Sequence, residues 1–220
     1  MLQQTQTDRV LDKYTLFLKT FPNFRTLAQA PVSKVLKVWQ GLGYNRRAIS
    51  LHRIAQIVVK EYHGRLPKTV EKLMALPGIG HYTASAICAF AFNQPTAFIE
   101  TNIRRVYLHF FFPRRKKVED QEILAVVEKT VDKKNPREWY YALMDYGVML
   151  KSLVPNPNRR SAHYTKQSKF EGSNRQIRGM ILKAMLNEPN LTISALVRIL
   201  GVDKEKIKQG YSITLATKLD

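Results

Sequence analysis

Apolar residues recur along most of the chain at intervals of three and four positions, the spacing of one helix face. The first stripe holds Val10, Tyr14, Phe17 and Leu18, which fall on one face of a first helix. The later stripes predict helices around Val35, Leu36 and Trp39 with Ser33 as cap, around Ile49, Ile54, Ile57 and Val58, and over 69–75. A further helix begins after Gly80, and others are predicted over 101–112, 121–129, 139–150 and 173–186. No run is typical of a strand, so the pattern predicts an all-α fold with short connections.

Two stretches interrupt this periodicity. Residues 113–117, PRRKK, form a basic loop, and residues 153–172 are rich in Pro, Asn, Ser and Lys. The second stretch is typical of an extended, positively charged connection. We therefore expect three parts: a six-helix module over 1–112, a second helical module with the basic loop over 113–172, and a C-terminal segment over 173–220.

The C-terminal segment contains LTISALVRILGVDKEKIKQG, which predicts two short helices on either side of a turn at Gly201. Thr192 and Asp203 are suited to cap the two helices. This is a helix-turn-helix pattern, and a cut-off winged helix would show it. A generic three-helix bundle shows the same pattern, so both interpretations stay open.

The charge balance indicates a polyanionic partner. The chain carries 36 basic and 17 acidic residues, a formal net charge of +19. The surplus runs along the whole chain, which favours nucleic-acid binding over a merely basic surface. The one cysteine, Cys88, lies in an apolar run and excludes an internal disulfide and a four-thiolate metal site. No run approaches a membrane span and the N-terminus is polar, so we expect a cytoplasmic protein.

A glycine-rich turn separates two apolar helices in ALPGIGHYTASAICAFAFNQPTAFIETNIRRV, residues 75–106. Pro77 and Gly78 turn the chain, and Gly80 begins the next helix. Glycines let backbone N–H groups at a helix N-terminus approach an anion closely. Such a hairpin can grip a phosphate backbone without reading the base sequence, although Pro-Gly-x-Gly by itself is a common turn.

Residues 75–106 resemble the helix-hairpin-helix DNA glycosylases, the superfamily of endonuclease III and the adenine DNA glycosylases. MLQQTQTDRV at the start, VWQGLGYNRRAISLH at 38–52 and YALMDYGVM at 141–149 resemble the adenine branch. The resemblance implies base excision repair, in which the enzyme flips a base and hydrolyses its N-glycosidic bond. The implied substrate is adenine opposite guanine or 8-oxoguanine in double-stranded DNA. The implied protein is a monomer that acts at the nucleoid and has no membrane partner.

The resemblance also implies a catalytic set. Glu100 stands where the family usually has an Asp, which stabilises an oxocarbenium-like sugar and positions water. The extra methylene of Glu could move the carboxylate by about 1 Å. An acid that only stabilises the helix N-terminus is the alternative for Glu100. Asn102 is implied to hold the pocket. Tyr82 stands where lyase members carry a Schiff-base lysine, which predicts monofunctional hydrolysis.

Further residues are implied to bind DNA or the excised base. Arg104 and Arg105 are expected to contact phosphates, and Leu2 to wedge the base stack. The residues implied to read or pack on the lesion pair are Gln3, Gln4, Thr5 and Tyr44, and those of the hairpin are Leu76, Gly78, Ile79, Gly80, His81 and Thr83. Asp145 matches an acidic position near the adenine pocket.

The chain departs from the family pattern in three places. The glutamate that protonates adenine lies just upstream of the MLQQTQ motif in the family, and Met1 falls inside that motif. In most relatives four cysteines follow the MDYGVM segment. This chain has no cysteine there, so we expect no iron–sulfur cofactor. Basic residues take that place and are expected to contact phosphates: Arg159, Arg160, Lys166 and Lys169. The β-rich domain that recognises 8-oxoguanine in many relatives has no counterpart in these residues.

Three alternatives follow from these departures. The first is a thymine-mismatch glycosylase, which Tyr82 does not exclude. The second is a non-catalytic DNA-binding protein that keeps the fold and charge. The third is a structural helical protein without duplex affinity, which the net charge of +19 disfavours.

Overall fold

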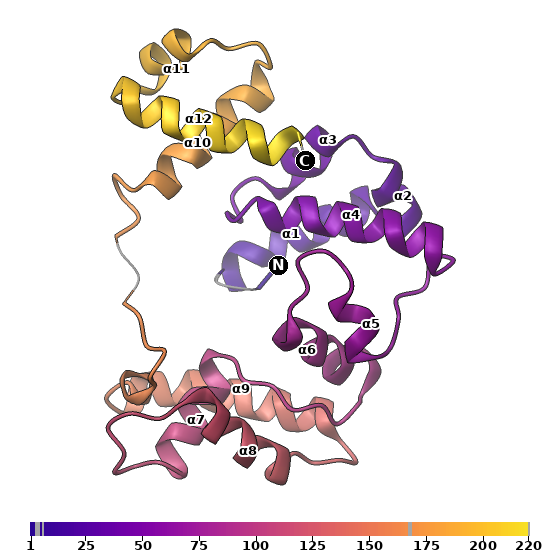
Figure 1. Cartoon of the computed structure of the whole chain (residues 1–220), viewed down its shortest axis with the longest axis vertical. Coiled ribbons are helices and arrows are strands. Elements are labelled where there is room, and N and C mark those ends of the chain that lie inside the picture. Colours follow the sequence, from indigo (N-terminus) through magenta and orange to yellow (C-terminus); the bar gives the residue numbers. More distant parts are fainter. Residues whose placement is uncertain (3–4, 6, 167–168, 220) are drawn as a thin grey trace. The chain divides into compact units, whose positions relative to one another are not determined.

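A computed structural model describes residues 1–2, 5, 7–166 and 169–219, without the side chains of 213–219. The described part is helical, as predicted, and contains no strand beyond an isolated bridge between Val118 and Ser161 (Figure 1). Its helices are α1 Thr7–Thr20, α2 Phe24–Gln29, α3 Val32–Trp39, α4 Arg46–Glu61, α5 Val70–Met74, α6 His81–Phe92, α7 Thr101–Phe110, α8 Asp120–Thr130, α9 Pro136–Leu153, the 3-10 helix η1 Pro157–Arg160, α10 Asn174–Asn187, α11 Ile193–Leu200 and α12 Lys204–Leu219. None of them is long and apolar enough to cross a membrane.

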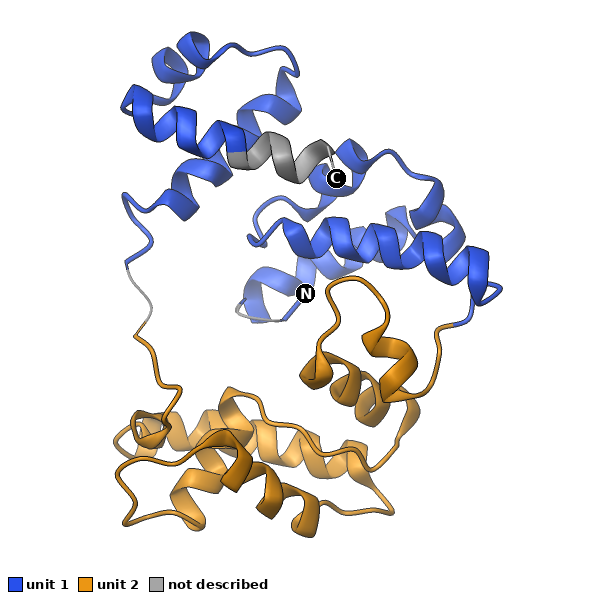
Figure 2. Ribbon diagram, viewed as in Figure 1, with its two compact units in different colours: residues 1–65, 167–220 blue, residues 66–166 orange. Residues whose placement is uncertain are grey.

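The chain divides into two compact units (Figure 2). Unit 1 combines residues 1–65 with residues 167–220, and unit 2 is formed by residues 66–166. These limits differ from the expected divisions at 112 and 172. The physical reason is that α6 and α7 pack against α9, which holds the hairpin region with the second helical module.

Unit 1 is built around an aromatic cluster. The ring of Phe17 on α1 meets Phe21 at 5.0 Å and Trp39 of α3 at 6.1 Å, both edge to face. Leu182 and Leu186 of α10 join this core. A second cluster within the unit holds the C-terminal helices together through the buried residues Ile177, Ile181, Met185, Leu196 and Ile207.

The first helix is confirmed, but only half of its apolar stripe is buried. Val10 and Phe17 are buried, whereas Tyr14 is 54% and Leu18 44% exposed. The core that α1 meets is narrower than the apolar stripe, because α1 packs chiefly on α3. Ser33 lies inside α3, whose cap is Pro31 without a side-chain hydrogen bond.

The short helix α2 was missed by the periodicity. Its six residues are too few to repeat a helical pattern, and it is defined by a capping box instead. Asn23 accepts a hydrogen bond from the backbone N–H of Thr26 at 2.9 Å.

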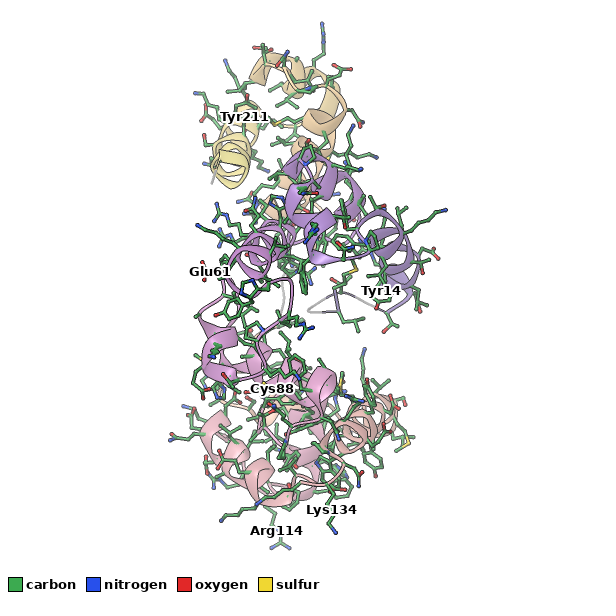
Figure 3. All side chains as sticks on the ribbon, turned by 90° about the vertical axis from the view of Figure 1, so that its right-hand side faces the viewer. Tyr14, Glu61, Cys88, Arg114, Lys134 and Tyr211 are labelled. Atoms are coloured by element: carbon green, nitrogen blue, oxygen red, sulfur yellow. The ribbon has the colours of Figure 1, made fainter. Side chains whose placement is uncertain are left out.

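Unit 2 is centred on the packing of α7 against α9. Ile103, Tyr107 and Leu108 of α7 are buried with Phe98 and with Tyr140 of α9. The rings of Phe98 and Tyr140 lie 4.1 Å apart, and the Tyr140 hydroxyl donates to the Thr96 carbonyl at 2.8 Å. In Figure 3 the side chains of Arg114 and Lys134 extend outward from this unit.

The expected extended connection over 153–172 is partly wrong. Residues 157–160 form η1, and the backbone of 160–162 pairs with Val118 through two hydrogen bonds of 2.9 Å. The N–H of Val118 donates to the Arg160 carbonyl, and the N–H of Ala162 donates to the Val118 carbonyl. Residues 153–166 of this stretch are therefore part of unit 2.

The predicted helix turn near the C-terminus is confirmed. Thr192 accepts a hydrogen bond from Ala195 N–H at 3.2 Å, which caps α11. The Asp203 carboxylate accepts two backbone N–H groups at the start of α12, at 3.0 and 3.2 Å. Gly201 takes the left-handed conformation, φ +62°, at the end of α11.

Candidate active site and nucleic-acid interface

Glu100 is the N-cap residue of α7. Its Oε1 accepts hydrogen bonds from the backbone N–H groups of Asn102 at 2.5 Å and Ile103 at 2.8 Å. Oε2 accepts no hydrogen bond among the described residues. The carboxylate is thus oriented by the helix through one oxygen, and the other oxygen is not engaged by the described protein.

The environment of Glu100 raises its pKa above the ordinary value. Burial is the largest cause, because it disfavours the ionised form. The two backbone hydrogen bonds and the charges of Arg105 and Arg104 act in the opposite direction without cancelling that effect. The capping role considered as the alternative is therefore present, and it leaves one oxygen of a poorly solvated carboxylate for other chemistry.

Tyr82 lies in the first turn of α6, in the same unit as Glu100. Its ring packs edge-on against Phe98 at 5.8 Å. Burial raises the pKa of the Tyr82 phenol to about 12, and the negative charge of Glu100 adds to the shift. The phenol is neutral near pH 7, and it lies close enough to Glu100 for the two groups to interact electrostatically.

Arg105 is a structural residue in this fold, which corrects its predicted phosphate contact. Its side chain is only 5% exposed, because it is enclosed between α7 and α9. The guanidinium donates to Asn102 Oδ1 at 2.8 Å and to the Gly147 carbonyl. Arg104 is also engaged within the protein, since it forms a bidentate pair with Asp120 at 2.9 and 2.6 Å.

Gly147 of α9 allows the first turn of α7 to approach closely. A Cβ atom at this position would lie 2.5 Å from the Asn102 carbonyl oxygen and 2.7 Å from its Cβ. Asn102 is thus held from two sides, by α9 and by Arg105, while its N–H orients Glu100. This arrangement joins Glu100 and Asn102, and Tyr82 of the same unit interacts electrostatically with Glu100.

The hairpin between α5 and α6 presents backbone rather than side chains. The N–H of Ile79 closes the turn on the Leu76 carbonyl at 3.2 Å, and Gly78 has φ +76°. Gly78, Gly80 and His81 are exposed, whereas Ile79 and Thr83 are partly buried. The Leu76 side chain is buried and anchors the hairpin, so the predicted contact of Leu76 with DNA would use its backbone and stays a prediction.

The two segments expected to read the lesion pair are joined in unit 1. The Thr5 hydroxyl donates to the Leu42 carbonyl at 3.2 Å. Leu2 and Tyr44 are exposed, and Tyr44 has φ +48°. Gln3 and Gln4 lie outside the described residues.

Arg47 of α4 fastens these segments, and sequence reasoning missed it. Its guanidinium donates to the Met1 carbonyl and to Thr5 Oγ1, both at 3.0 Å. It also donates to the carbonyls of Leu42 at 3.3 Å and Gly43 at 3.2 Å. The guanidinium lies 5.4 Å from the ring centre of Tyr44. The sequence offers two adjacent arginines here and no signal for which one is enclosed.

Among the remaining predicted residues, Asp145 is exposed on α9, and Arg159, Lys166 and Lys169 are exposed. Arg160 is corrected, because its guanidinium donates to the carbonyls of Leu108 at 2.6 Å and Pro113 at 3.3 Å. A buried residue without a sequence signal, Asn158 of η1, donates to the Thr101 carbonyl at 3.0 Å. The η1 segment thus braces the start of α7.

The residues present do not fit a four-thiolate iron–sulfur cluster. Cys88 is the one cysteine of the chain. Its thiol is buried in α6 and points its Sγ to the Lys68 carbonyl at 3.5 Å. Burial also raises the pKa of this thiol.

Comparisons with known proteins agree with this architecture. The model of the HhH-GPD superfamily of base excision DNA repair proteins matches residues 1–130. An adenine DNA glycosylase of Buchnera aphidicola is 34% identical over 71% of this chain and 45% of its own length. The mouse adenine DNA glycosylase is 33% identical over 89% of this chain and 38% of its own. The chain therefore spans less than half the length of these two relatives.

A third relative and two solved structures extend the comparison. The adenine DNA glycosylase of Mycobacterium tuberculosis is 30% identical over 84% of this chain and 67% of its own. The structure of a thermostable thymine-DNA glycosylase has a TM-score of 0.59 at 25% identity, covering 67% of this chain and 70% of that one. A trapped endonuclease III–DNA intermediate has a TM-score of 0.54 at 21% identity, covering 68% of each chain, which shows a shared fold.

Proposed function

Because the chain belongs to the HhH-GPD superfamily of base excision DNA repair proteins, we propose that it is a monofunctional DNA N-glycosylase. Its substrate would be adenine paired with guanine or 8-oxoguanine in double-stranded DNA. The names of the relatives support this choice, since those at 30–34% identity are adenine DNA glycosylases. We also infer that it acts as a monomer at the nucleoid.

The observation that carries the proposal is the oriented carboxylate of Glu100. Cleavage of an N-glycosidic bond develops positive charge on the sugar, and a fixed carboxylate stabilises that charge. Two backbone N–H groups hold Oε1 of Glu100 in place, so little reorganisation is needed during the reaction. Oε2 can then face the sugar or orient the attacking water.

Tyr82 supports hydrolysis without strand cleavage. A Schiff-base mechanism needs an amine, and a phenol cannot form the imine. With a pKa of about 12, the Tyr82 phenol stays protonated in the assay range and can donate a hydrogen bond. Its role is to shape the site beside Glu100.

Duplex binding is supported by the charge and by the exposed backbone of the hairpin. The net charge of +19 favours release of counterions from the phosphates. The exposed Gly78 and Gly80 leave the start of α6 accessible to a phosphate group. Leu2 and Tyr44 are exposed side chains of the segments fastened by Arg47, and they are suited to contact the lesion pair.

The test is single-turnover base excision followed by alkaline cleavage, on 8-oxoguanine·A, G·A and G·T duplexes. We expect excision of adenine, a loss of about 10²-fold or more in Glu100→Gln, and retained activity in Glu100→Asp. Glu138→Gln removes an exposed acid of α9 and is the matched control.

Each outcome decides between the candidate functions. Excision of thymine alone would replace adenine by thymine as the substrate. Duplex binding without any excision, unchanged by Glu100→Gln, would overturn the enzyme and leave a non-catalytic DNA-binding protein. Absence of duplex affinity would refute the proposal altogether.

A further inference from the structure

The helices α10, α11 and α12 lie outside residues 1–130, the part that matches the family. They form a small bundle in which α10 packs on α12 and α11 joins them (Figure 1). Leu196 and Ile207 are buried at its centre with Ile181. Gly201 lies at the turn after α11, as the sequence predicts.

A groove runs between α10 and α12. Its lining consists of Asn174, Ile177, Arg178, Lys206, Gln209 and Gly210. Gly210 lets the two helices approach, because a Cβ atom there would lie 2.7 Å from Ile181 Cδ1. The floor is therefore apolar, and two cationic and two amide side chains line the groove.

The charges at this groove are of one sign. Among the residues whose side chains the structure describes, no acidic one lines it. Two nearby acids are already engaged, since Asp203 accepts hydrogen bonds at the start of α12 and Glu205 pairs with Lys208 at 3.3 Å. Between residues 173 and 212 the chain carries seven basic and three acidic residues, a net charge of +4. The groove is thus suited to an anion that accepts several hydrogen bonds.

We propose that this groove binds the phosphate backbone of duplex DNA. Arg, Lys, Asn and Gln side chains supply most protein contacts to DNA phosphates, and all four types line the groove. In helix-turn-helix proteins the first helix crosses the DNA backbone, and helix N-termini are among the groups that contact phosphates. Asn174 and Lys206 lie in the first turns of α10 and α12. The contact is independent of base sequence, and it adds to the affinity for DNA that residues 1–130 supply.

The test uses the full chain and an undamaged duplex of about 25 base pairs, whose binding is measured between 50 and 200 mM salt. Arg178→Gln combined with Lys206→Gln is compared with the wild type. Each phosphate contact adds about 0.9 to the slope of log affinity against log salt, so the double variant should lower the slope by about 1.8. If the two proteins bind equally at 1 M salt, this slope change is a loss of affinity of about 60-fold at 0.1 M salt.

The matched control is Lys183→Gln combined with Arg198→Gln. Both residues are exposed on the same bundle and neither lines the groove. We expect this pair to leave the slope within about 0.5 of the wild type, since it removes charge but no contact. The exchange Arg178→Lys with Lys206→Arg should restore most of the affinity.

Equal slope changes in the two double variants, or none in either, would overturn the proposal. Thermal unfolding confirms that each variant folds, and the charge-keeping exchange separates lost contacts from lost structure. Because the duplex is undamaged, the result does not depend on excision. Failure of the proposed glycosylase activity would appear in the excision assay alone.

Discussion

Replacing Gly147 with alanine tests how the carboxylate of Glu100, proposed to be catalytic, is positioned. The new Cβ would lie 2.5 Å from the Asn102 carbonyl oxygen, where ordinary contact begins at 3.4 Å, so about 0.9 Å of displacement is required. The contacting atoms belong chiefly to backbone, which cannot rotate away. The first turn of α7 must therefore shift relative to α9, and it carries the two N–H groups that hold Glu100.

The expected magnitudes follow from two opposing effects. Alanine in a helix is favoured over glycine by about 1 kcal/mol, whereas overpacking costs about 1–3 kcal/mol. We expect a net loss of up to about 2 kcal/mol in the free energy of unfolding. A displacement near 1 Å at a positioned group predicts about a 10²-fold loss of excision rate.

Urea unfolding and single-turnover excision measure the two effects. Gly179→Ala is the control, because Gly179 lies in α10 with no atom within 4 Å of the added Cβ. This control should gain up to about 1 kcal/mol of stability and keep its excision rate. If Gly147→Ala were stabilised like the control and remained fully active, the close approach of α7 to α9 would not position Glu100.

The remaining predictions concern pH, Arg47 and Cys88. The raised pKa of Glu100 means that its contribution to stability is fully present below the ordinary value of 4.5 and is lost as pH rises through the folded pKa. Glu100→Gln should therefore become more stable relative to the wild type across that range, as followed by urea unfolding at several pH values, while wild-type excision rises with ionisation. A difference in unfolding free energy between the two proteins that stays constant with pH would contradict this. Arg47→Met leaves the carbonyls of Met1 and Leu42 without this donor and should lower stability by about 1–3 kcal/mol, whereas the exposed Arg46→Met should change it by under about 0.5 kcal/mol. Equal urea midpoints for the two arginine variants would show that Arg47 does not fasten the segments. The buried Cys88 thiol should react with a disulfide reagent only on unfolding, and fast labelling of native protein would refute its burial.

Much of the fold could be predicted from the sequence, because helical periodicity and caps are local signals. The bounds of α5, the start of α6 at His81 and the caps Thr192 and Asp203 all depend on neighbouring residues. The resemblance located Glu100 and Tyr82 through contiguous motifs, which the match to residues 1–130 supports at the level of the family.

Only the tertiary structure decided which residues of similar type serve the surface and which serve the interior. Phosphate contacts were predicted for Arg104, Arg105 and Arg160. Each of their side chains instead donates hydrogen bonds to other residues of unit 2. Charge and spacing are the same for an exposed and an enclosed arginine, since enclosure depends on which distant carbonyl or carboxylate lies opposite.

The sequence by itself determined an all-α chain of strong positive charge with the motifs of a DNA glycosylase and one cysteine. The tertiary structure decided the narrow core contact of α1, the fastening role of Arg47 and the close approach at Gly147. These features join residues more than 20 positions apart, and no local pattern encodes the distance between them. The groove between α10 and α12 is of the same kind, because its donors come from two helices that meet only in the folded chain.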